Sequence, residues 1–275
     1  MRFPMRPKIS SGHICTALIA AVALAWPMRT IAGEAAVVRI EAIGTVFRAT
    51  LSDGTVKQGK ELAGAVLVFE VQGSPVRIRI ASIMPDPGDK TGSVLLHDFR
   101  SDETGEPLCN PAPDGTRLGF PLPGRTAPDG RLLAAEPGVF ELVCTAGAQD
   151  KCVRYGYHPW EPAPDGRPMR DYYDACVRMV RADYCGDGRA WTRDGTLIDL
   201  WDRLGLQQAE SRSDASFSFE AGWSPNGALC VARTRIPENI SLDRLEALCP
   251  RLNAMPVCDE ATAHAGGALL FNRSR

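Results

Sequence analysis

The sequence predicts an α+β fold, mainly antiparallel β with two or three short helices, stapled by disulfides. Three observations predict this class. Short runs of branched and aromatic residues fill the first half and are separated by Asp-Gly or Gly-Ser turns. One amphipathic helical pattern follows them. Eight cysteines remain once an N-terminal leader is set aside.

The predicted strands lie mostly before residue 145. The runs are VVRIEAIGTVFRATL, GAVLVFEV, VRIRIASI and VFELVC. In the third run apolar residues alternate with arginines, as in a strand with one face in water. The stretch from Asp102 to Asp129 holds six prolines, so we expect a long irregular loop there, held to the body by Cys109.

The first predicted helix runs from Asp171 to about Arg181. Its apolar positions follow the i, i+3, i+4, i+7 rule and predict a buried face of Tyr173, Cys176, Val177 and Val180. Asp171 is a suitable N-cap, and Asp174 lies in the first turn, where negative charge is favourable.

The last third of the chain predicts one more helix and a hairpin. Leu242 to Leu248 is expected to be helical, with Ser241 before it and Pro250 after it. Alternation predicts a strand from Ser216 to Trp223, with Phe217, Phe219, Ala221 and Trp223 on one face. Ala228–Thr234 is expected to be its hairpin partner.

The N-terminus has the layout of a cleavable secretory signal peptide over residues 1–33. Three basic residues precede an apolar run from Ile14 to Trp26, and Pro27 ends it. That run as a helix reaches only about 20 Å, short of the roughly 30 Å hydrocarbon core. We therefore expect a periplasmic or secreted protein with no membrane span after cleavage.

The charge of the remaining chain disfavours polyanion binding. The whole chain has 31 Lys+Arg and 33 Asp+Glu, and the leader removes four basic residues. The mature chain then has 27 basic and 33 acidic residues, a net charge near −6. We expect no nucleic-acid partner. We expect residues 34–108 to form a β-rich part, packed as one unit with a disulfide-rich α+β part over residues 109–275.

An even number of cysteines in an exported chain predicts disulfides. Sequence spacing favours three local bridges and one long-range bridge: Cys144–Cys152, Cys176–Cys185, Cys249–Cys258 and Cys109–Cys230. The second bridge requires the helix to end before Asp183, because a continuous helix would hold its cysteines about 13 Å apart. A zinc site would need C-x-x-C or Cys/His spacing, which the sequence lacks, so we expect no bound metal of that kind.

The segment Cys176–Asp202, CVRMVRADYCGDGRAWTRDGTLIDLWD, gathers acidic and aromatic side chains. The candidate ligand-binding residues are Asp183, Tyr184, Asp187, Trp191 and Asp194. Calcium could bind several carboxylates in such a turn-rich stretch, but their spacing departs from the EF-hand pattern. The competing interpretation is structural: Asp-Gly makes turns, Asp caps helices, and Asp183 pairs with a nearby arginine such as Arg181.

The tetrapeptide Ala182–Cys185 resembles the signature of the bacterial ADYC domain. Further blocks agree: KCVRYGYHPW, CVRMVRADYCGDG, FEAGWSPNGALCVARTR and LCPRL, so the resemblance covers about Cys109 to Leu252. It implies an exported protein. It brings no catalytic or binding residues with it, because the family has no assigned activity.

Three functions are compatible with these observations. The first is a non-enzymatic binding or structural module built on the ADYC segment, with a protein or a carbohydrate as its partner. The second is an extracytoplasmic hydrolase with Asp183 or Asp187 as acid or base. The third is a secreted inhibitor or toxin-like factor. No catalytic residue can be assigned from the sequence, and a deep pocket beside Asp183 and Asp187 would favour the hydrolase.

Overall fold

The computed structural model describes residues 35–71, 73–89, 92–210, 216–255 and 257–275. The predicted signal peptide lies outside these residues. Among the described helices, none is both long and apolar enough to span a membrane.

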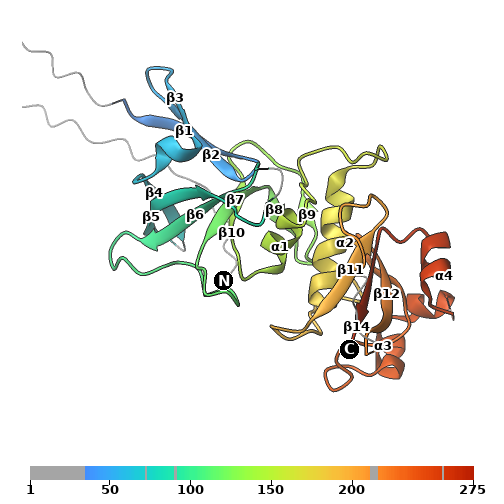
Figure 1. Cartoon of the computed structure of the whole chain (residues 1–275). Coiled ribbons are helices and arrows are strands. Elements are labelled where there is room, and N and C mark those ends of the chain that lie inside the picture. The colour runs from blue at the N-terminus through green and yellow to red at the C-terminus, as the bar shows by residue number, and fades with distance from the viewer. Residues whose placement is uncertain (1–34, 72, 90–91, 211–215, 256) are drawn as a thin grey trace, which may run out of the picture.

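Two antiparallel sheets make up the N-terminal half (Figure 1). The first has three strands, β1 (Val37–Ile43), β2 (Val46–Leu51) and β3 (Val56–Gln58). A 3-10 helix, η1 (Gly59–Leu62), leads into the second sheet, whose order is β10-β7-β6-β5-β4. Its strands are β4 (Val66–Val71), β5 (Ser74–Pro85), β6 (Leu95–Ser101), β7 (Gly119–Pro123) and β10 (Phe140–Cys144). A two-stranded ribbon, β8 (Arg125–Thr126) with β9 (Leu132–Leu133), lies between β7 and β10 in sequence.

Strand β7 corrects part of the expected Asp102–Asp129 loop. All five of its residues, GFPLP, are buried, and all five pair with β10. Proline is unusual inside a sheet because it has no N–H to donate. Here β7 meets β6 only at His97 opposite Gly119, so Pro121 and Pro123 face no second ladder. The proline-rich sequence is therefore compatible with a strand.

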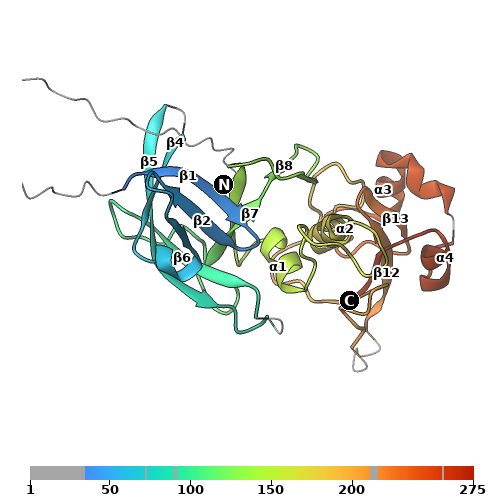
Figure 2. The ribbon, with the colours of Figure 1, turned by 90° about the horizontal axis from the view of Figure 1, so that it is seen from above.

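The C-terminal half is a helix-covered sheet. The sheet is antiparallel with the order β11-β14-β12-β13: β11 (Ile198–Asp202), β14 (Leu270–Ser274), β12 (Ser218–Ser224) and β13 (Gly227–Val231). The helices are α1 (Ala148–Arg154), α2 (Met169–Arg181), α3 (Leu242–Leu248), the 3-10 helix η2 (Pro250–Ala254) and α4 (Glu260–Ala265). α2 and α4 both pack on β12, and Figure 2 shows α1 and α2 between the N-terminal sheets and the C-terminal sheet.

The predicted fold class is confirmed, with four short α-helices where two or three were expected. The β12–β13 hairpin is confirmed. Helix α3 has the predicted bounds, and its Ser241 hydroxyl accepts the Arg244 N–H at 3.4 Å.

Helix α2 begins two residues earlier than predicted. Its N-cap is Pro168 and not Asp171. Nine of its residues are buried, from Met169 through Met179, so the helix is enclosed on more than one face. Tyr173, Cys176 and Val177 are buried as predicted, whereas Val180 is only partly buried.

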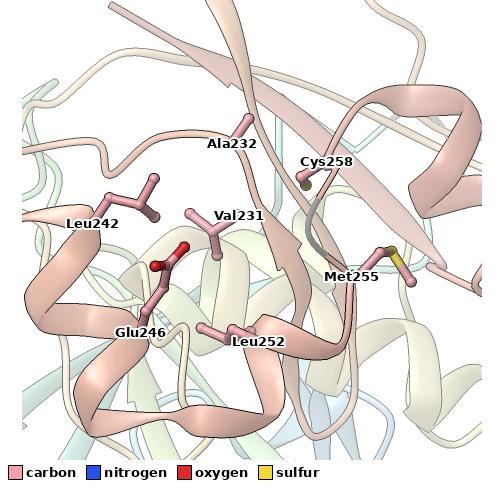
Figure 3. A pocket seen from close by; sticks show the side chains of 7 residues that line it. All are labelled: Val231, Ala232, Leu242, Glu246, Leu252, Met255 and Cys258. Carbon is pink, nitrogen blue, oxygen red and sulfur yellow. The ribbon is translucent and has the colours of Figure 1, made fainter.

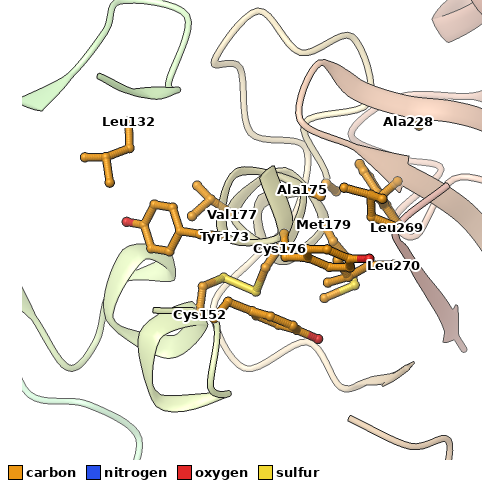
Figure 4. Packing of buried hydrophobic residues seen from close by; sticks show 14 of the residues in the cluster. Leu132, Cys152, Tyr173, Ala175, Cys176, Val177, Met179, Ala228, Leu269 and Leu270 are labelled. Atoms are coloured by element: carbon orange, nitrogen blue, oxygen red, sulfur yellow. A yellow bond between two sulfur atoms is a disulfide. The ribbon is translucent and has the colours of Figure 1, made fainter. Parts of the chain in front are cut away.

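Besides a small cluster of Cys230, Ala263, Ala268 and Phe271, two larger hydrophobic clusters lie in the interior. One lies between the N-terminal sheets and contains Phe47, Phe69, Ile80, Phe99 and Phe140. The other surrounds α2, and Figure 4 shows its side chains on several sides of that helix. The cluster around α2 includes Leu96 of β6 and Phe120 of β7 as well as residues of β12 to β14. Residues on both sides of the expected boundary at residue 108 therefore share one core.

All eight expected cysteines are in disulfides, but each of the four predicted pairings is wrong. The bridges are Cys109–Cys144, Cys152–Cys176, Cys185–Cys249 and Cys230–Cys258, with Cα–Cα distances of 5.5 to 5.8 Å. Cys152–Cys176 joins α1 to α2, and these helices pack against one another. Sequence spacing failed as a guide because tertiary packing, and not chain proximity, brings the sulfur atoms together.

Candidate functional site

The chain reverses direction directly after α2, in the segment Ala182–Gly188, which we call the ADYC turn. Ala182 has a φ of 51°, in the left-handed region, and its N–H bonds back to the Arg178 and Met179 carbonyls. A C-terminal cap in this conformation is usually glycine. Here the alanine is fully buried within the cluster around α2, so its methyl group contributes packing that glycine could not.

Asp183 is fully buried, and both of its carboxylate oxygens are engaged. Oδ2 lies 2.5 Å from Nη1 of the equally buried Arg178 and accepts the Gly188 N–H at 2.9 Å. Oδ1 accepts the N–H groups of Gly186 and Asp187 at 3.0 and 3.2 Å. Burial raises the pKa of Asp183, and the Arg178 charge opposes that rise. The carboxylate thus holds the turn that follows it.

The expected pairing of Asp183 with Arg181 is wrong. Arg178, one helical turn earlier, is the partner, and Arg181 donates instead to the Gly188 carbonyl. Arg178 also donates to the carbonyls of Pro225 and Asp129, which lie 47 and 49 residues away in sequence. One arginine therefore connects the helix, the turn, the β8–β9 ribbon and the β12–β13 hairpin.

Tyr184 is part of the ADYC turn, and it is fully buried. Its ring stacks on Trp223 of β12, with centroids 5.3 Å apart. Its hydroxyl donates to Glu220 at 3.0 Å and accepts the backbone N–H of Arg235 at 2.8 Å. Burial raises the pKa of Tyr184 well above its ordinary value, so the hydroxyl stays protonated as a donor.

Glu220 is the centre of a buried polar network. Its two oxygens accept four bonds: from Tyr184, twice from Arg235 at 3.0 Å, and from Asn272 of β14 at 2.8 Å. The Asn272 side-chain oxygen in turn accepts the Trp223 indole N–H at 2.8 Å. Buried charges are tolerated when they are paired and hydrogen-bonded to this extent.

Arg235 also caps the C-terminal end of α2. It donates to the Met179 and Val180 carbonyls at 2.7 and 3.2 Å. These carbonyls lie in the last turn of the helix, where a positive charge is favourable. The network around Glu220 thus fixes where α2 ends relative to the sheet.

Two glycines allow the ADYC turn and the hairpin turn to meet backbone to backbone. A Cβ on Gly186 would lie 2.0 Å from the Asn226 carbonyl oxygen. A Cβ on Gly227 would lie 2.6 Å from the backbone carbonyl oxygen of Tyr184. Arg251 of η2 joins the same contact by donating to the Tyr184 and Asn226 carbonyls, each at 2.9 Å. The Cys185–Cys249 bridge then connects the turn to the residue just before η2.

The sequence blocks that resemble the ADYC domain therefore lie together in the fold. Comparison with family models supports that resemblance. The model described as ADYC domain matches residues 59–237. The chain belongs to the ADYC domain family. No match to this ADYC protein was found among curated proteins or among solved structures.

The four letters of the ADYC signature each have a structural role in this chain. Ala182 turns the chain, Asp183 binds the turn amides and Arg178, Tyr184 joins the Glu220 network, and Cys185 forms a disulfide. The block KCVRYGYHPW, which precedes the tetrapeptide in sequence, is joined to β11, since Tyr157 donates to Asp202 at 2.7 Å.

The five predicted ligand-binding residues do not gather around one cavity in the ADYC protein. Asp183 and Tyr184 are enclosed, whereas Asp187 and Asp194 are exposed. Asp187 accepts the Arg189 N–H at 2.9 Å, which is ordinary turn chemistry. The partly buried Trp191 has the Arg189 guanidinium 5.6 Å from its ring centroid. Within the described residues, no group of three or more His, Cys, Asp or Glu side chains could hold a metal ion.

Sequence reasoning missed the residues that complete the ADYC site: Arg178, Glu220, Arg235, Arg251 and Asn272. The alternation predicted for residues 216–223 left Glu220 on the face opposite the apolar residues. A β-bulge explains that error, because the β12–β14 register shifts between Phe219 and Ala221. No sequence signal marks such a bulge.

Proposed function

We propose that this protein is an exported, non-enzymatic binding or structural module in which the ADYC turn holds the fold together. One observation carries the proposal: the charged and polar groups of the signature are buried and hydrogen-bonded to the protein itself. Asp183 accepts three backbone amides and an arginine, and Tyr184 bonds to Glu220 and Arg235. An acid or base in catalysis must instead reach a substrate proton within hydrogen-bonding distance.

Export is supported by the disulfides. Four bridges of this kind form and persist in an oxidising compartment such as the periplasm or the extracellular space. A cytosolic location would keep the thiols reduced. The proposal therefore combines a periplasmic or secreted location with a disulfide-bonded module.

The substitution Asp183→Asn tests the structural role, because it keeps the shape and removes the charge. It leaves the buried Arg178 guanidinium without a counter-charge, so we expect the free energy of unfolding to fall by about 3 kcal/mol. Added calcium or soluble sugars should not restore it. Chemical denaturation monitored by tryptophan fluorescence measures the change.

Asp187→Asn is the matched control, since Asp187 is in the same turn but exposed. We expect its effect to stay within about 0.5 kcal/mol. The proposal is wrong if Asp183→Asn is as stable as the parent and has lost a binding or catalytic response that the parent shows.

A further inference from the structure

A small pocket lies away from the ADYC turn, between the end of β13 and the α3–η2 segment (Figure 3). Its volume is about 210 Å³. The lining residues are Val231, Ala232, Leu242, Glu246, Leu252, Met255 and Cys258. An apolar cavity of about 150 Å³ already accepts benzene, so this one has room for one amino acid side chain. Most of its lining lies beyond the residues that match the family model.

Glu246 is the one charged residue among those that line the pocket. Figure 3 shows its carboxylate directed toward Val231, between Leu242 and Leu252. The side chain is partly buried, and among the described residues it has no hydrogen-bond or ion-pair partner. This contrasts with Asp183 and Glu220, whose oxygens are all engaged within the protein.

The pocket chemistry favours a lysine side chain over other occupants. A lysine has an apolar four-carbon stem, which suits aliphatic and thioether walls, and a compact terminal charge, which suits one carboxylate. An arginine would bring five N–H donors to a site with a single charged acceptor group, and unmet buried donors are costly. An anionic side chain would be repelled by Glu246.

We propose that this pocket binds a lysine side chain of a partner protein, with its stem between Leu242, Val231 and Leu252 and its ammonium group on Glu246. Without the predicted signal peptide the chain has 33 acidic and 27 basic residues, and this net negative charge favours a basic partner. The proposal deepens the binding-module function and rests on it. It specifies a recognition site for one cationic residue on a partner surface.

The test uses blocked amino acids as probes and the mature, disulfide-bonded protein. N-acetyl-lysine methylamide is titrated against its norleucine and arginine counterparts, and binding is followed by NMR chemical shifts of the pocket residues. Norleucine has the same stem without the ammonium group. We expect the lysine probe to bind at least about tenfold more tightly than either counterpart, because a charge-assisted hydrogen bond is lost or left incomplete.

Three variants test whether the probes bind in this pocket. Glu246→Gln should reduce lysine binding to the norleucine level, whereas Glu238→Gln, an exposed residue outside the lining, should leave it unchanged. Ala232→Leu adds bulk to the pocket wall without changing charge, and it should abolish binding of all three probes.

Three results would overturn the proposal: no binding of the lysine probe to the parent protein, equal binding of lysine and norleucine, or equal losses in Glu246→Gln and Glu238→Gln. A preference for free pentylamine over the blocked lysine would also overturn it, since the occupant would then be a small amine. Each of these results leaves the stability of Asp183→Asn unaffected, because the pocket lining includes no residue of the ADYC turn. Failure here is therefore distinguishable from failure of the proposed structural role.

Discussion

Asp150 of α1 is the buried carboxylate that the fold satisfies least. It is fully buried, and neither of its side-chain oxygens has a hydrogen-bond partner among the described residues. Arg154 lies 3.7 Å away but bonds more closely to Asp86, at 3.0 Å through Nη2. Burial raises the pKa of Asp150 to about 7, and Asp86 adds to the rise while Arg154 and Lys151 oppose it. The folded state therefore keeps a proton on Asp150 that the unfolded state loses near pH 4.

This shift predicts that stability falls as the pH rises. A raised pKa in the folded state contributes stability that is complete below about pH 4 and is lost as the pH rises through 7. Asp174, whose pKa burial also raises to about 7, acts in the same direction. Asp150→Asn should therefore stabilise the protein at pH 8, by on the order of 2 kcal/mol, and reduce the decline between pH 5 and 8. Denaturation curves across that range measure both effects, and an unchanged pH profile would contradict the assignment.

At the scale of elements, the contact between α2 and the C-terminal sheet depends on a bulge in β12. Ala221 and Trp223 pack in the cluster around α2, whereas Phe219 packs with Ala263 on the α4 side. Without the bulge between them, all three would share one face, as the alternation predicted. The irregularity lies at Glu220, whose carboxylate is buried with Tyr184 and Arg235. The Glu220 carboxylate thus fixes both the C-terminal end of α2 and the bulged strand β12.

Tyr184→Phe tests that connection between α2 and β12. The change removes one donor to Glu220 and one acceptor of the Arg235 N–H while keeping the ring stacked on Trp223. We expect a loss of about 1–3 kcal/mol in the free energy of unfolding.

Tyr173→Phe, in helix α2, is a matched control. Tyr173 is equally buried, but its hydroxyl has no hydrogen-bond partner among the described residues. Losing that hydroxyl should therefore be neutral or stabilising. Equal destabilisation of the two variants, measured in one denaturant series, would show that the network around Glu220 adds nothing beyond packing.

For the whole molecule, the disulfides connect its successive parts. Cys109–Cys144 ties the proline-rich segment to β10, Cys152–Cys176 ties α1 to α2, and the two C-terminal bridges secure α3, η2 and the segment before α4. Removing a native bridge typically costs about 2–5 kcal/mol, so reduction should lower the melting temperature markedly.

Protein expressed with its own leader and collected outside the cytoplasm should therefore contain no alkylatable thiol. Non-reducing peptide mapping should recover the four bridges, Cys152–Cys176 among them, and N-terminal sequencing should find a chain shortened by about 32–35 residues. Several free thiols, or an intact Met1 in the exported form, would contradict the proposed location.

The sequence by itself determined the local features of this protein. The alternation within β5, the helical spacing of α2 and the Ser241 cap of α3 depend on neighbouring residues, so they could be predicted from the chain. The even number of cysteines likewise predicted a disulfide-bonded fold, and the ADYC tetrapeptide predicted the family.

Only the tertiary structure decided which residues act together. The partner of Asp183, the burial of Glu220 and all four disulfide pairings depend on contacts between segments that are distant in sequence, such as Tyr184 with Glu220 and Arg235. A buried charge is tolerated only where another segment supplies its counter-charge and hydrogen bonds, and spacing along one chain does not encode that meeting. The same is true of the pocket at Glu246, whose walls come from β13, α3 and η2 and form only when these elements pack.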